Sequence, residues 1–227
     1  MNPILLDPTE IWPTIDAERI HLADLLDDLS PDEWREPSLC AGWTVKDVAA
    51  HLTLQEVGFG AALAMLVRNG GNVDRGIRRG ACDRAREWSE RQIVATVRAM
   101  VGSRRRNAGV THRETLIDLL VHTQDITVPL GRRHEPPPRA AATAAARLWT
   151  MRWPPPSPAT RALRGLRLAA TDLGWSIGDG PLVEGPVTAL MLLTAGRPAA
   201  LPRVTGPGAA EADARLSRLG TAPAKES

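Results

Sequence analysis

The sequence predicts an α+β protein with a helical bundle over residues 1–152, a proline-rich linker over 153–160 and a small α/β C-terminal domain over 161–221. Three observations predict this order. Apolar residues recur at three- and four-residue steps through the first two thirds of the chain, as on one face of a helix. The segment 153–158 contains four prolines, which stop a helix. After it, apolar and polar residues alternate with the period of a β-strand.

The predicted helices begin at residues that cap helix N-termini. Thr44 precedes an apolar-periodic stretch, and Ser89 and Thr111 are each followed three residues later by Gln or Glu, which forms a capping box. The predicted helices of the bundle span 14–29, 45–68, 90–101, 112–128 and 138–152. Glycines and arginines with few apolar residues fill 69–83, so the sequence predicts a long loop there.

The C-terminal domain is predicted to mix strands and helices. Residues 166–171 alternate in the manner of a strand, and 175–177 form a second short strand that turns at Gly178–Pro181. An apolar helix follows over 186–195, and an amphipathic helix over 208–219 ends the domain.

Composition excludes several classes of protein. Cys40 and Cys82 are the only cysteines, too few for a disulfide scaffold or a four-cysteine zinc module, and they predict a cytoplasmic protein with reduced thiols. No stretch approaches the ~18 uncharged apolar residues that cross a bilayer. The first residues lack the basic start and apolar run of a secretory signal. We therefore expect no membrane partner.

Charge is unevenly distributed although the net charge is only +2. Residues 1–66 hold twelve acidic and three basic side chains, whereas 68–113 hold twelve arginines and four acidic side chains. The arginines lack the interleaved aromatic residues of a single-strand binder, and no helix-turn-helix pattern is present. The sequence thus predicts no nucleic-acid partner, and the two blocks are interpreted as facing each other and solvent.

Three side chains on predicted helices have the spacing of metal ligands. Asp118 and His122 are four residues apart, which places both on one face of a helix. His51 on a neighbouring helix would complete a set of two histidines and one carboxylate, which leaves coordination positions open. The alternative is an isolated histidine and an ordinary helical pair. Asp118 lies among leucines, however, and a buried carboxylate needs a partner.

Four segments resemble one known family. They are Pro37–Leu52, Asp118–Ile126 with the Pro129-Leu130-Gly131 that follows, Leu166–Ser176 with the Gly178–Pro181 turn, and Leu193–Arg197. Together, in this order, they resemble the mycothiol-dependent maleylpyruvate isomerase family, which is part of the DinB-like metal-binding proteins. The resemblance implies a DinB-like four-helix bundle followed by a small α/β C-terminal domain.

The resemblance also implies the components of a site. His51, Asp118 and His122 would bind a divalent metal, namely zinc, with nickel, manganese and iron as alternatives. Mycothiol would be the thiol cofactor, and Arg197 would be a catalytic arginine. The family usually has Glu where this chain has Asp118. Because Asp is one methylene shorter, the helix must lie closer to the metal or a water must bridge.

The function implied is a metal-dependent enzyme that uses mycothiol. It would act as a cis–trans isomerase of the maleylpyruvate type or as an S-transferase, with a small-molecule thiol and an electrophilic substrate as partners, in a monomer or homodimer. One alternative is a non-catalytic binding bundle with a weakened metal site. A second is an iron oxygenase triad, but that set usually lies on a β-barrel and the helical pattern argues against it.

Two further residues near these motifs have open interpretations. Cys40 is interpreted as a small structural residue. Asp125, three residues after His122, is either a hydrogen-bond partner of an imidazole or a polar residue near a helix end. An arginine of the 69–83 segment is an alternative to Arg197 for contacting substrate carboxylates.

Overall fold

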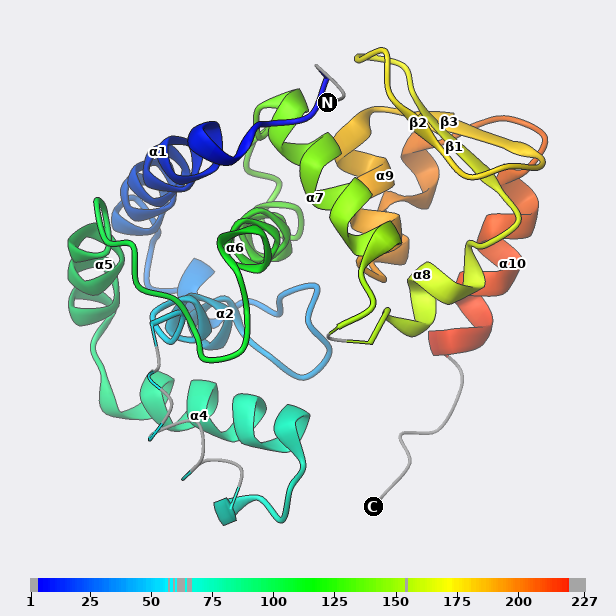
Figure 1. Ribbon diagram of the computed structural model, residues 1–227. Helices are drawn as coiled ribbons and strands as arrows, with labels where there is room; N and C mark the ends of the chain where they lie inside the picture. The colour runs from blue at the N-terminus through cyan, green and yellow to red at the C-terminus, as the bar shows by residue number, and fades with distance from the viewer. Residues whose placement is uncertain are drawn as a thin grey trace. The chain divides into compact units, whose positions relative to one another are not determined.

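The protein is described here by a computed structural model in which, over the described residues, nine α-helices and two 3-10 turns accompany a three-stranded sheet, so the α+β prediction is confirmed (Figure 1). The chain divides into two compact units. One comprises residues 7–134, and the other comprises 4–6 with the described residues after 134. The structure describes residues 4–56, 58, 60, 64, 67–153 and 155–220.

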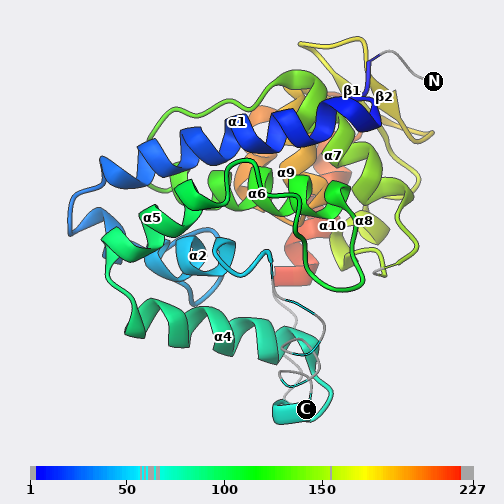
Figure 2. The same cartoon turned by 60° about the vertical axis from the view of Figure 1, so that its left-hand side comes forward.

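The first unit is helical, and a bundle forms its core (Figures 1 and 2). α1 packs against α5 and α6, while α2 packs against α4, α5 and α6. Apolar side chains on these faces are completely buried, among them Ile15, Leu22, Val48 and Leu120. The elements are α1 (Pro8–Asp27), the 3-10 turn η1 (Glu33–Arg35), α2 (Val45–Leu52), α4 (Val73–Glu87), α5 (Glu90–Ala99) and α6 (His112–Thr127).

α1 begins six residues before the predicted start at residue 14. Asp7 caps it, accepting from the backbone N–H groups of Thr9 and Glu10, while the Glu10 side chain accepts from the N–H of Asp7. Pro8 occupies the first turn, where its missing N–H costs nothing. Pro13 lies inside the helix without ending it, which is why the sequence pattern suggested a later start.

The predicted helix over 45–68 is shorter in the structure. α2 ends at Leu52, where the backbone N–H of Thr53 bonds to the carbonyl of Ala50, and residues 53–56 form turns. Of the predicted continuation, residues 57, 59, 61–63, 65 and 66 lie outside the described residues, whereas residues 60, 64, 67 and 68 are helical. The early end of α2 matters for the site, because it turns the next few side chains back toward α6.

The prediction of a loop over 69–83 is wrong, because most of this segment belongs to α4. Asn72 caps the helix through its side chain, and Arg75, Arg78 and Arg79 are exposed. Gly76, Ala81 and Ala85 are buried on the other face, where α4 lies along α2 (Figure 2). Such small residues let two helices approach closely, so tertiary packing overrides the low helix propensity of glycine.

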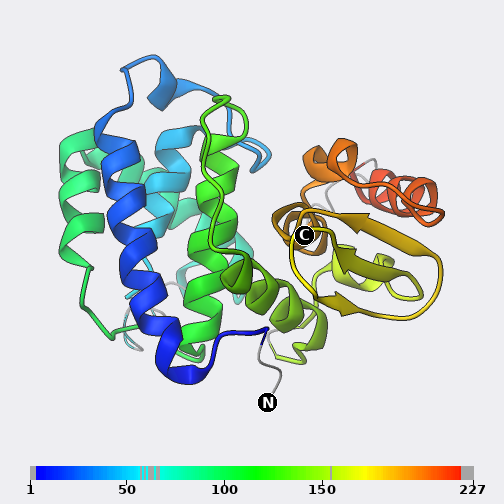
Figure 3. The same ribbon diagram turned by 90° about the horizontal axis from the view of Figure 1, so that it is seen from above.

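The second unit combines a three-stranded sheet with helices (Figures 1 and 3). The strand order is β2-β1-β3, with β1 antiparallel to β2 and parallel to β3. Leu168 on β1 pairs with Ile177 and Val183, and α9 packs against both β1 and β3. The elements are α7 (Pro138–Thr150), α8 (Pro158–Ala162), β1 (Arg167–Ala170), β2 (Ser176–Ile177), β3 (Leu182–Gly185), α9 (Val187–Thr194), η2 (Pro198–Arg203) and α10 (Ala209–Gly220).

Three features of this unit differ from the sequence prediction. β3 was not predicted, because four residues ending in glycine carry almost no periodic signal. α7, predicted as the last helix of the bundle, belongs to the second unit because it packs against α9. The linker predicted over 153–160 gives way to α8 at Pro158, capped by Ser157. The remaining predicted domain limits stay predictions. Among the described residues, no helix is long and apolar enough to cross a membrane.

An ion pair at one end of the bundle makes stability pH-dependent. Arg132 donates from Nε to Glu33 Oε1 at 2.7 Å and from Nη2 to Glu33 Oε2 at 3.1 Å. These bonds, with those from Ser30, lower the pKa of Glu33 to about 2. Because the pKa of Glu33 is lower in the folded protein than in the unfolded chain, where it is near 4.3, ionised Glu33 stabilises the fold at pH values above about 4.3. This stabilisation is lost as the pH falls toward about 2.

We therefore expect Glu33→Gln to lower the free energy of unfolding near neutral pH and to have little effect at about pH 2. Urea unfolding of both proteins at several pH values measures the difference. Glu36→Gln is the control, since it removes a charge beside the same 3-10 turn without affecting Arg132. A difference that stays constant from neutral to acid pH would contradict the expectation.

Candidate metal centre

Two capping boxes determine where the candidate ligands lie. The Thr44–Asp47 box begins α2, so that His51 falls in its last turn. The Thr111–Glu114 box begins α6, which carries Asp118 and His122 on one face. Because α2 and α6 pack against each other, the His51 side chain meets this face.

The three predicted ligands converge in the structure. Asp118 Oδ1 lies 3.2 Å from His51 Nε2 and 3.3 Å from His122 Nε2. The ligand atoms of a tetrahedral zinc ion at ~2.0–2.1 Å are themselves about 3.3–3.4 Å apart. One atom from each residue lies within 4.8 Å of the others, and the three side chains are partly buried. The residues present therefore fit a divalent cation.

Electrostatics couples these groups. Burial raises the pKa of Asp118, but the charge and hydrogen bonds of His51 and His122 outweigh it and hold this pKa well below its ordinary value. Burial lowers the pKa of His122, but hydrogen bonds to Asp118 and Asp125 outweigh it and hold this pKa well above its ordinary value. The Asp118 carboxylate and the His122 imidazole thus favour each other's charged form.

Asp125 is the hydrogen-bond partner of the His122 imidazole. This is one of the two roles that the sequence left open for it. Its Oδ2 lies 2.8 Å from His122 Nδ1, which directs Nε2 of that ring toward Asp118. Asp125 is completely buried, and Cys40 donates from Sγ to the same oxygen at 3.1 Å. A carboxylate behind a ligating histidine is a common way of fixing ring orientation in metal sites.

His51 is held differently. Its Nδ1 is buried without a hydrogen-bond partner among the described residues. The Trp43 ring lies 5.4 Å from the imidazole, between ring centroids, and is 8% exposed. The Arg78 guanidinium lies 5.7 Å from the Trp43 ring and donates to the carbonyl of Ala41 at 2.7 Å. Packing therefore restrains His51, and an arginine of α4 supports the packing residue.

Gln55 is a site residue that the sequence analysis missed. Its amide nitrogen lies 2.8 Å from Asp118 Oδ2. No sequence signal identifies it, because it lies in the irregular turn that follows α2. Arg197, the predicted catalytic arginine, belongs to the other unit, where its Nη1 donates to the carbonyl of Ala195 at 2.6 Å. Its catalytic role stays a prediction.

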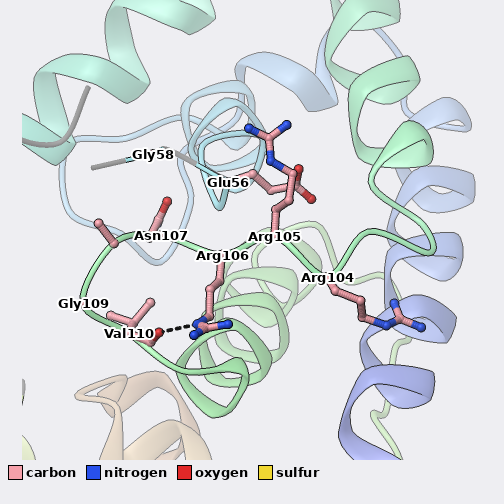
Figure 4. A pocket seen from close by; sticks show the side chains of 9 residues that line it. Glu56, Gly58, Arg104, Arg105, Arg106, Asn107, Gly109 and Val110 are labelled. Carbon is pink, nitrogen blue, oxygen red and sulfur yellow. Dashed lines mark hydrogen bonds between the residues drawn. The ribbon is translucent and has the colours of Figure 1, made fainter. Parts of the chain in front are cut away.

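A separate cavity of about 610 Å³ lies in the helical unit, lined by Glu56 and by the loop between α5 and α6 (Figure 4). Figure 4 shows that Arg104, Arg105 and Arg106 point in different directions from this loop. Arg104 pairs with an aspartate of α1 at 2.8 Å, and Arg106 donates to the carbonyl of Val110 at 2.8 Å. The three guanidinium groups do not converge on one point, so the cavity is not a built anion site.

Fold and site together define a helical bundle with two histidines and one carboxylate, joined to a small α/β unit. Residues 15–127 match the family model described as the mycothiol maleylpyruvate isomerase N-terminal domain. The chain belongs to this family through that domain.

Solved structures agree with this fold. The chain is similar to the crystal structure of the mycothiol-dependent maleylpyruvate isomerase, with a TM-score of 0.57 and 18% identity over 90% of this chain and 94% of that chain. A histidine-to-alanine mutant of that isomerase matches with a TM-score of 0.58 and the same identity and coverage. At this identity the likeness shows the fold. No curated protein matches the sequence.

Proposed function

We propose that this protein is a metal-dependent enzyme with mycothiol as its thiol cofactor, acting as a cis–trans isomerase of the maleylpyruvate type. The observation that carries the proposal is the convergence of His51, Asp118 and His122 within the N-terminal domain of this family. The alternative within the same class of enzyme is S-transfer, in which the thiol is transferred to an electrophilic small molecule. Both reactions would begin with attack of the thiolate on the substrate.

The proposed ligands are His51 Nε2, His122 Nε2 and Asp118 Oδ1. A divalent cation bound there, most simply zinc, would lower the pKa of a coordinated thiol so that the thiolate forms at neutral pH. Three protein ligands leave a position for that thiol. Asp125 fixes the tautomer of His122 through Nδ1, and Trp43 packs beside the His51 ring on the wall of the site.

The nucleophile in this proposal is the cofactor thiolate, whereas Cys40, the cysteine beside His122, has another task. Cys40 donates its S–H to Asp125 at 3.1 Å, and this contact supports a structural role. For the isomerisation, mycothiol would supply a thiolate that adds to the activated cis double bond and leaves again as the trans double bond forms, so that no proton or electron is transferred overall.

In S-transfer the same thiolate would instead stay bonded to the substrate carbon, and the substrate would gain a proton or lose a leaving group to balance the new carbon–sulfur bond. Arg197 remains the candidate for a bidentate contact with a substrate carboxylate, on the strength of the sequence resemblance alone. Arg78 of α4 is the alternative from the helical unit, since it lies beside Trp43.

The proposal is tested with the full-length protein, first stripped of metal and then titrated with zinc. We expect one zinc ion per chain to bind tightly. The loaded protein should isomerise maleylpyruvate only when mycothiol is added. Consumption of mycothiol with a panel of electrophiles distinguishes S-transfer from isomerisation. A protein that binds no zinc, or that binds zinc without any thiol-dependent turnover, would be the non-catalytic binding bundle and would contradict the proposal.

A further inference from the structure

Gln55 makes a buried contact with the central carboxylate of the site. It lies three residues after the end of α2 and is 3% exposed. Its Nε2 donates to Asp118 Oδ2 at 2.8 Å and lies 3.5 Å from the carbonyl oxygen of Thr115. A carboxylate can only accept hydrogen bonds, so the amide nitrogen must face it.

The two oxygens of Asp118 therefore have different partners. Oδ1 faces the imidazoles of His51 and His122, and Oδ2 faces the amide of Gln55. We propose that Gln55 is a positioning residue that reserves Oδ2, so that Asp118 binds the metal through Oδ1 alone. This inference rests on the proposed function, because it concerns the same metal.

The physical reason lies in the shortness of the aspartate. Its carboxylate has few positions from which it reaches the point between two imidazoles, and rotation about its last bond exchanges the two oxygens. If both oxygens bound the metal, they would use a coordination position that the thiol needs. A hydrogen bond of 2.8 Å from a buried amide opposes both rotation and two-oxygen binding.

Another proposed ligand, His122, is also held by a buried polar side chain. Asp125 holds His122 through Nδ1, on the side away from Asp118. Two of the three proposed ligands are thus each fixed by a buried polar side chain, Asp125 for His122 and Gln55 for Asp118. Removing such partners typically weakens metal binding by about 10–100-fold.

The experiment compares Gln55→Leu and Gln55→Glu with wild type. Cobalt(II) is the probe, because its visible absorption is strong in four-coordinate sites and weak when a fifth ligand binds. We expect both variants to bind cobalt and zinc about 10–100-fold more weakly. In Gln55→Leu the freed Oδ2 should also weaken the visible bands, as expected for a fifth ligand.

The control is Gln124→Leu. Gln124 is an equally buried glutamine of α6 whose amide donates at 2.7 Å to the carbonyl of His134, away from Asp118. Gln124→Leu should leave cobalt affinity and spectrum unchanged. Gln55→Glu keeps the size of the side chain and retains the test if Gln55→Leu fails to fold.

The outcomes separate the two proposals. Wild-type protein that binds no cobalt or zinc would contradict the proposed function itself. A different result would overturn only the role of Gln55. In that case wild-type protein binds both metals, and Gln55→Glu and any folded Gln55→Leu have the same metal affinity and the same cobalt spectrum as wild type.

Discussion

Replacing His51 with alanine is expected to abolish metal binding and, with it, all thiol-dependent turnover. The imidazole comes from α2, whereas the other two proposed ligands lie on α6, so no neighbouring ligand substitutes for it. Loss of one of three ligands should weaken zinc binding about a thousandfold or more, which corresponds to roughly 4 kcal/mol. Metal analysis after dialysis, and titration of the apo-protein, measure the effect.

The variant should remain folded, because alanine is the best helix former and position 51 lies in a helix. His21→Ala is the matched control, since His21 is a histidine of α1 whose side chain is 63% exposed. It should bind a full equivalent of zinc. Full zinc occupancy in His51→Ala would show that the three converging side chains are not the metal ligands.

Replacing Arg19 with methionine is expected to destabilise the helical unit by about 3 kcal/mol. Arg19 lies on α1 and is 1% exposed. Its Nη1 donates to the carbonyl of Met100 at 2.6 Å and to that of Ser103 at 3.3 Å, which links α1 to the end of α5. Its Nη2 lies 3.8 Å from Glu56 Oε1.

The size of the expected effect follows from what the substitution leaves behind. Methionine fills much of the same volume but donates no hydrogen bond, so the carbonyls of Met100 and Ser103 each lose a donor. Leaving a buried acceptor without its partner costs about 1–3 kcal/mol of stability. Glu56, with a side chain only 17% exposed, also loses its cation. Urea unfolding of the metal-free protein measures the change without interference from the metal.

Arg98→Met is the control for removing an arginine. Arg98 lies on α5, and its side chain is 48% exposed although it pairs with Asp24 at 2.8 Å. Exposed ion pairs contribute roughly 0–1 kcal/mol, so this variant should lose little stability. If Arg19→Met lost no more than Arg98→Met, the buried guanidinium would not hold α1 to α5.

The capping boxes in the sequence predicted helix starts well, whereas the start of α1 and the extent of α2 were predicted less well. The boxes at Thr44, Ser89 and Thr111 all cap helices, because each uses groups within four residues of one another. The prediction for residues 69–83 was wrong because this helix does not depend on local groups. It depends on small residues packed against α2, and no pattern within the segment reveals that partner.

By itself the sequence determined that Asp118 and His122 share one face of a helix, since a separation of four residues suffices for that. It also proposed His51, on a neighbouring predicted helix, as the third member, and the family resemblance implied the same residue. Only the tertiary structure decided that Asp118 turns one oxygen to both imidazoles and the other to Gln55. His51 and Gln55 lie more than sixty residues from Asp118, so their contacts depend on how α2 ends and how it packs against α6.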